Sequence, residues 1–243
     1  MQAIKKKDFT EGPLFGRIFL FTVPIMLTGI LQLLYNAADH IVVGRFSSNP
    51  NALAAVGSTS SLNNLIINLI IGLSIGGSIL VAQHIGAKRY NDVSRAVHTA
   101  IALSVICGFL FMSVGLLISK PMLILMDTNE IILEDAVLYI RLICLGIPAT
   151  SVYNFGAGIL RAGGNSKTPL IILSLSGILN VILNLIFVIC FGLDVEGVAL
   201  ATVISQYASA IAVICVLLKS KECYAFSFKK LRIDRISLKK YCF

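Results

Sequence analysis

The stretch LIINLIIGLSIGGSILVA, at residues 65–82, contains no charged side chain and decides the fold class. A helix needs about 20 predominantly apolar residues to cross the roughly 30 Å hydrocarbon core of a bilayer. Six runs of the chain meet this requirement, at about 15–44, 54–86, 94–119, 132–160, 168–192 and 195–218. A membrane barrel would show short alternating strands instead. We therefore predict an all-α, polytopic membrane protein with a bundle of six transmembrane helices at 1–218 and a basic cytoplasmic tail at 219–243.

The composition supports the same class. Of the 243 residues, 57% are hydrophobic and 13% are charged, and the mean hydropathy is +0.89. Soluble domains contain about 25% charged residues, so the chain has too few polar groups to cover a surface in water. Intrinsic disorder requires the opposite balance of hydrophobicity and charge. Both a soluble domain and a disordered chain are excluded.

The lysines and arginines that give the net charge of +8 follow the pattern of a membrane topology and do not form a patch for binding nucleic acid. Seventeen of the 20 lysines and arginines flank the runs on one side, whereas only Arg45 and Lys120 lie on the other. Cytoplasmic loops are the ones enriched in lysine and arginine. We therefore expect a multi-pass protein of the cell membrane with both termini in the cytoplasm, and no nucleic-acid partner.

No pattern typical of an enzyme emerges. Gly72-Leu-Ser-Ile-Gly76 resembles a hydrolase nucleophile elbow, but that motif requires a strand-to-helix turn and this one lies in a continuous apolar run. The step from Gly72 to Gly76 instead predicts a face for close helix packing. The cysteines and histidines show no metal-ligand spacing. We expect neither an enzyme nor a cofactor.

A polar stripe in the first run is the strongest functional signal. Its members recur at intervals of three and four residues and therefore share one helix face: Thr28, Gln32, Tyr35, Asn36 and Asp39. A carboxylate within a membrane span is expensive and is by default a functional candidate. The alternative is that Asp39 lies at the outer membrane interface.

The fifth and sixth runs contain matching stripes, Ser176, Asn180 and Asn184 in one and Thr202, Ser205, Gln206 and Ser209 in the other. Such residues can simply hold helices together by hydrogen bonds. Three stripes that converge, one of them with a carboxylate, favour a polar chamber that binds a cation or a proton.

The ordered set of motifs resembles the multidrug and toxic compound extrusion (MATE) family, over roughly residues 10 to 220. The resemblance rests on Pro24, Gln32–Asp39, Val43–Arg45, Ala52–Gly57, Gly72–Leu73, Val81–Ala87, Pro148, Leu160–Asn165, Pro169, Leu179–Asn184 and Gly197–Gln206. It implies one six-helix lobe, the N-terminal one, of a twelve-helix antiporter. Such transporters export cationic, amphipathic drugs and other xenobiotics against an inward proton or sodium gradient.

The resemblance also implies residue roles. The cation-coupling positions match Asp39, Asn180, Asn184 and Thr202, and the substrate-chamber positions match Gln32, Tyr35 and Asn154. The coupling ion would be H+ or Na+, and Na+ at the coupling site is the only metal ion expected. Many relatives have aspartate where this chain has Asn184. Because an amide does not titrate near neutral pH, proton coupling would depend on Asp39, whereas amide oxygens remain suitable ligands for sodium.

Two alternatives remain. A flippase lobe for lipid-linked oligosaccharides shares the two-lobe design, but we would then expect several cations in the cavity, where this chain has Asp39 and amides. A truncated lobe without transport of its own is the other, since the chain stops at Phe243 after six runs. The expected partners are small cationic substrates, the bilayer, and either a second six-helix lobe or another copy of the chain.

Overall fold

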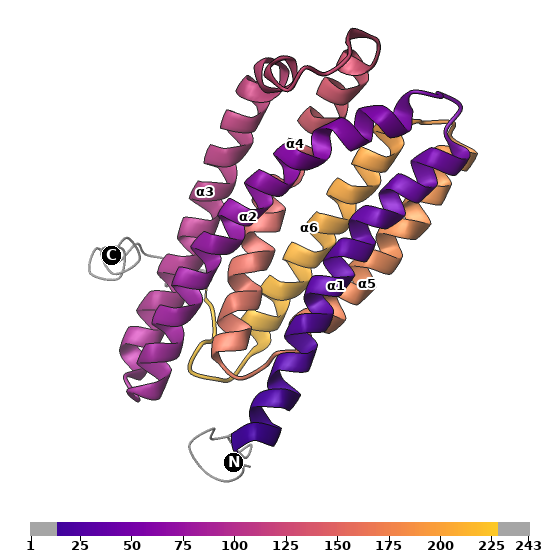
Figure 1. Ribbon diagram of the computed structural model, residues 1–243. Helices are drawn as coiled ribbons and strands as arrows, with labels where there is room; N and C mark the ends of the chain where they lie inside the picture. Colours follow the sequence, from indigo (N-terminus) through magenta and orange to yellow (C-terminus); the bar gives the residue numbers. More distant parts are fainter. Residues whose placement is uncertain (1–13, 228–243) are drawn as a thin grey trace.

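The computed structural model describes residues 14–227, and the regular elements of this part of the chain are all helices (Figure 1). The helices are α1 (Leu14–Phe46), α2 (Ala52–Gly86), α3 (Tyr90–Leu125), α4 (Glu130–Ala162), α5 (Lys167–Leu185) with a π-helical turn η1 (Ile186–Cys190), and α6 (Val195–Lys219). This confirms the predicted all-α class.

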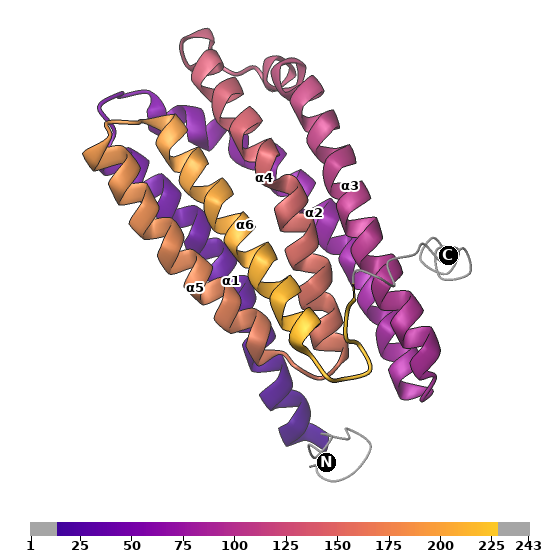
Figure 2. The ribbon, with the colours of Figure 1, turned by 180° about the vertical axis from the view of Figure 1, so that it is seen from behind.

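The helices alternate in direction along the bundle (Figure 1). The start of α1, the α2–α3 and α4–α5 connections and the end of α6 lie at one end, and the other three connections lie at the opposite end. Seen from either side, α1 and α5 lie together along one flank and α3 lies along the other (Figures 1 and 2).

Five of these helices have the length and hydropathy of a membrane span, and α4 is the exception. It packs against α2, α3 and α6, and most of its second half is buried, including Tyr153 and Asn154. A helix that is surrounded by other helices is shielded from lipid and tolerates more polar residues. The central position of α4 explains why its hydropathy is lower than that of its neighbours.

Glycines allow α3 and α4 to approach closely. A Cβ atom at Gly108 would lie 2.7 Å from the Cα of Pro148, and one at Gly115 would lie 2.6 Å from the Sγ of Cys144. Both distances are shorter than van der Waals contact, so a larger residue at Gly108 would push against the α4 backbone and one at Gly115 would displace the Cys144 side chain.

Gly72 and Gly76 do not form a packing face within residues 14–227, because a Cβ atom at either position would meet nothing within 4 Å there. The face of α2 that approaches α4 instead contains Ser74 and Ser78, and a Cβ at Gly158 would lie 3.2 Å from the Cβ of Ser78. Positions two residues apart point about 200° apart on a helix. The glycine pair therefore lies almost opposite the packing face.

Polar contacts join the connections at the end where α6 begins. The Asp194 carboxylate accepts hydrogen bonds from the Ser47 hydroxyl (2.7 Å) and the Ser48 backbone N–H (2.9 Å). Partial burial raises the pKa of Asp194, but these hydrogen bonds outweigh it and hold the pKa below its usual value. Asn49 also donates to Asp135 of α4 at 2.8 Å. The α1–α2 connection is thereby tied to both α4 and α6.

At the opposite end, the segment after α6 folds back onto the bundle. Phe226 is 4% exposed and its backbone N–H donates to the carbonyl of Leu217 (3.1 Å). The Ser227 N–H donates to Nε2 of the buried His98 at 3.1 Å, and Tyr224 packs against Gly163. Residues 219–227 of the predicted tail therefore lie against α3 and α4, and residues 228–243 lie outside the described residues.

Candidate functional site

Asp39 lies inside the bundle, at a point where α1, α5 and α6 meet. Its side chain is 4% exposed. The Asn184 amide donates to Oδ1 at 2.7 Å, and the Thr202 hydroxyl donates to Oδ2 at 2.9 Å. Asp39 is seven residues from the end of α1, about 10 Å along the helix. The structure therefore places Asp39 within the bundle and not at its outer edge.

Asn180 extends this group into a network of four side chains. Its amide donates to the Thr202 hydroxyl at 3.0 Å, and its Oδ1 accepts from the Asn184 amide at 3.2 Å. The two asparagines are four residues apart and therefore lie on one face of α5. Both are fully buried, and Thr202 is 6% exposed. The four residues predicted together from the sequence are thus brought together in space, and we call them the Asp39 cluster.

The local backbone is unusual next to this cluster. α5 ends at Leu185, one residue after Asn184, and the chain continues as the π-helical turn Ile186–Cys190. Single π-helical turns occur frequently at functional sites, because the extra residue re-aims the preceding side chains. The change from α-helical to π-helical backbone therefore begins two residues after Asn184, the residue that donates to Asp39.

The Asp39 cluster has the chemistry of a site for a small cation. A buried charge needs compensation, and here Asn184 and Thr202 hydrogen-bond to the carboxylate without cancelling its charge. Oδ1 of Asn184 is buried and accepts no hydrogen bond within the described part of the chain. Carboxylate, amide and hydroxyl oxygens are the ligand types that hard cations prefer, and Asp39 can also take up a proton.

Other members of the stripes have a purely structural role. Ser176 donates to the carbonyl of Ser205 at 2.6 Å and links α5 to α6. Ser205 and Ser209 donate to carbonyls of their own helix, those of Ala201 and Gln206. The interpretation of the stripes as interhelical hydrogen bonding therefore applies to part of them, and the carboxylate separates the Asp39 cluster from the rest.

The three residues predicted for a substrate chamber do not form one group. Tyr35 lines an apolar groove of about 310 Å³ between α1 and α5, next to Gly177. Gln32 lies one turn earlier on α1 and is half-buried. Asn154 is buried in α4, where its amide donates to the carbonyl of Thr150 at 2.9 Å.

Two residues near the site escaped the sequence analysis. Tyr139 of α4 is 5% exposed and packs in one cluster with Val42 and Val43, the α1 residues that follow Asp39 by about one turn. Gly146, also of α4, lies directly against the side chain of Gln206. Neither residue belongs to a periodic polar stripe, so the spacing of residues carries no signal for them. Only the packing of α4 between its neighbours identifies them.

Comparison with known proteins gives a consistent family. The MatE family model matches residues 24–186. The chain is 29% identical over 203 residues to the probable multidrug resistance protein YpnP of Bacillus subtilis, covering 84% of this chain and 45% of the relative. It is 32% identical over 206 residues to the probable multidrug resistance protein YoeA of the same organism, covering 83% and 44%.

The fold agrees with these matches. A solved structure titled "Crystal structure of MATE in the bent conformation" superposes with a TM-score of 0.90 at 27% identity, over 99% of this chain and 53% of that chain. This chain spans about half the length of the proteins it matches.

Proposed function

Because the chain belongs to the MatE family, we propose that it forms the N-terminal six-helix half of a cation-coupled antiporter that exports cationic, amphipathic drugs. The observation that carries this proposal is the Asp39 cluster, in which a buried carboxylate is hydrogen-bonded by neutral side chains from two other helices. The names of the relatives YpnP and YoeA as multidrug resistance proteins support the same class of substrate.

The Asp39 cluster would bind the coupling ion. For a proton, Asp39 is the member of the cluster whose side chain can take up and release one, because the amides and the hydroxyl do not titrate near neutral pH. For sodium, the carboxylate, the hydroxyl of Thr202 and the amide oxygen of Asn184 supply hard ligands. Asn184 Oδ1 favours a direct role for an ion, because it is buried and accepts no hydrogen bond from the described residues.

A cationic substrate fits the charge of this half. Asp39 is a carboxylate close to the groove of α1 and α5 that Tyr35 lines, and the remaining lining of that groove is mainly apolar. A hydrophobic surface beside one negative charge suits a molecule that is both apolar and cationic. We place Gln32, Tyr35 and Asn154 on the substrate path and the second half of the transporter opposite them.

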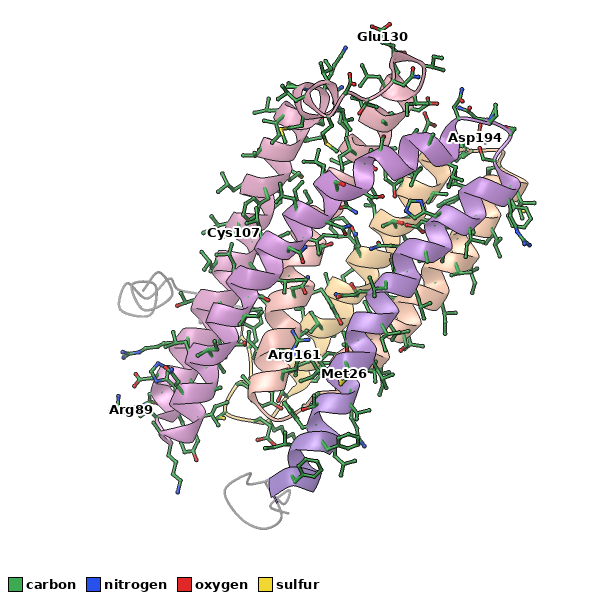
Figure 3. The ribbon with its side chains drawn as sticks, in the orientation of Figure 1. Met26, Arg89, Cys107, Glu130, Arg161 and Asp194 are labelled. Atoms are coloured by element: carbon green, nitrogen blue, oxygen red, sulfur yellow. The ribbon has the colours of Figure 1, made fainter. Side chains whose placement is uncertain are left out.

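We place the protein in the cell membrane with both termini in the cytoplasm. Figure 3 shows Arg89 and Arg161 toward one end of the bundle, and Glu130 and Asp194 at the other. Loops rich in arginine and lysine remain on the cytoplasmic side. The end that contains Arg89 would therefore face the cytoplasm, together with residues 219–243.

The deciding experiment compares two substitutions in the intact transporter. We expect Asp39→Asn to abolish gradient-driven efflux, because it removes the only charge of the cluster, and Asn184→Ala to reduce efflux less, because it removes a neutral ligand. Efflux of a cationic dye from vesicles is measured under an imposed proton gradient and, separately, an imposed sodium gradient.

Asp127→Asn is the matched control. It also converts a carboxylate to an amide, but Asp127 is exposed, at a turn with φ 57° that asparagine tolerates. This variant should retain full activity. If Asp39→Asn matches the parent under both gradients, the cluster does not couple transport to an ion.

A further inference from the structure

A second groove lies between α3 and α4, near the connection that joins them. It has a volume of about 270 Å³ and is lined by Lys120, Leu133, Glu134, Val137, Leu138 and Arg141. α3 runs along the flank of the bundle opposite α1 and α5 (Figures 1 and 2). The groove is therefore separate from the Asp39 cluster and from the groove that Tyr35 lines.

The two cationic residues of the groove, Lys120 and Arg141, lie at an unusual depth in the membrane for charged side chains. Arg141 lies 11 residues after the start of α4 at Glu130, about 16 Å along a helix that is about 50 Å long. The hydrocarbon core measures only about 30 Å. If α4 is centred in the bilayer, the backbone of Arg141 lies about 7 Å inside the hydrocarbon boundary, and its long side chain can reach toward the headgroups. Lys120 lies five residues before the end of α3, also near this boundary.

The groove has an excess of positive charge. Lys120, Glu134 and Arg141 are all exposed on the surface of the bundle, and one carboxylate can neutralise only one of the two cations. The neighbouring Asp135 is engaged on another face of α4, where it accepts a hydrogen bond from Asn49 at 2.8 Å. One cation at the membrane boundary thus lacks a charge partner of its own in this groove.

Apolar side chains continue the groove toward the centre of the membrane. Leu138 lines the groove, is 38% exposed and lies three residues nearer the start of α4 than Arg141, whereas Leu145 lies about one turn beyond Arg141 and is 42% exposed. On α3, Leu117 is 78% exposed one turn before Lys120. The surface therefore combines two cations whose long side chains can reach headgroup depth with apolar side chains beside and below them, a combination that suits a phospholipid headgroup and its acyl chain.

We propose that the groove of Lys120 and Arg141 binds an anionic phospholipid. The two cations would contact the headgroup phosphate, and one acyl chain would lie along Leu138 and Leu145. Basic pockets on the cytoplasmic side of membrane helices select anionic headgroups, and the same charge attraction would act in this groove at the opposite end of the bundle. Glu134 weakens the site, since its charge repels the phosphate.

The test uses a single fluorescent reporter in the groove of the intact protein. The chain contains no tryptophan, so Leu138→Trp introduces a probe at the proposed acyl contact, and the parent without it supplies the background. Its quenching is measured in vesicles that contain brominated phosphatidylglycerol or brominated phosphatidylcholine at equal mole fraction. We expect a preference of about fivefold for phosphatidylglycerol, the size expected from one uncompensated cation near anionic lipid.

Charge variants that also contain Leu138→Trp test whether the groove is the source of the preference for phosphatidylglycerol. Lys120→Gln with Arg141→Gln should abolish the preference, whereas Glu134→Gln should increase it. Arg89→Gln with Arg95→Gln removes the same charge at the other end of α3 and should leave the preference unchanged. Added inorganic phosphate should not displace the lipid, because it lacks the acyl contact.

Three results would overturn the proposal. Equal quenching by both lipids would show that the groove does not select charge. An unchanged preference in the variant without Lys120 and Arg141 would place the selectivity elsewhere. Protection of the reporter from both lipids would show that protein, such as a second lobe, covers the groove.

Discussion

Among single residues, Thr202 connects two members of the Asp39 cluster through one hydroxyl group. Its hydroxyl donates to Asp39 at 2.9 Å and accepts from Asn180 at 3.0 Å. Thr202→Val keeps the shape but removes both hydrogen bonds, and leaves a carboxylate oxygen and an amide N–H of the cluster unsatisfied. We expect a loss of about 1–3 kcal/mol in the free energy of unfolding, together with weaker stimulation of efflux by the coupling ion.

Thermal unfolding in detergent and vesicle efflux measure these two effects. Thr202→Ser is the matched control, because it retains a hydroxyl that can make both hydrogen bonds, and it should remain close to the parent in both assays. If Thr202→Val retains the stability and the ion response of the parent, the Thr202 hydroxyl contributes neither to stability nor to ion coupling.

Among the helices, α4 determines how closely the bundle packs. A Cβ at Gly108 would lie 2.7 Å from the backbone of Pro148 in α4, so Gly108→Ala forces α3 and α4 apart. Overpacking of this kind costs about 1–3 kcal/mol. We expect a lower thermal unfolding temperature, measured in detergent by the fluorescence of a thiol-reactive dye. Gly72→Ala is the control, since a Cβ there meets nothing within 4 Å, and it should unfold at or above the parent's temperature. A Gly108→Ala protein as stable as the parent would contradict this close approach.

The helices also show which parts of the structure the sequence determines locally. The stripes that contain Asp39, Asn184 and Thr202 were predictable, because spacing of three or four residues places side chains on one face whatever the neighbours are. Partners across helices have no such local rule. Gly72 and Gly76 have the spacing of a packing motif but meet no neighbour, whereas Gly108 lacks that spacing and touches α4.

For the whole molecule, burial of the Asp39 cluster changes what is expected of the six helices by themselves. Asn180 and Asn184 are fully buried between α1, α5 and α6, so these polar groups do not depend on a second half for shielding from lipid. By contrast, α1 is mostly exposed, with Leu20 at 68% and Leu33 at 71%. The exposed face of α1 is apolar, so it can contact either lipid or a second half of the transporter without leaving polar groups unsatisfied.

The last prediction concerns residues 1–243 expressed as a separate chain. Transporters built from two repeats place the substrate path at the interface between them, and six helices supply only one wall of that path. We expect the separate chain to fold, because its polar cluster is buried within the bundle and hydrogen-bonded between its helices, but to give no gradient-driven efflux as a monomer. The oligomeric state in detergent and dye efflux from reconstituted vesicles are measured on the same preparation, with a two-lobe relative as the positive control. Efflux from a dimer would show that a second copy supplies the missing wall. Efflux from a stable monomer would contradict the two-wall requirement, and the path would then have to run through this bundle itself, past Asp39.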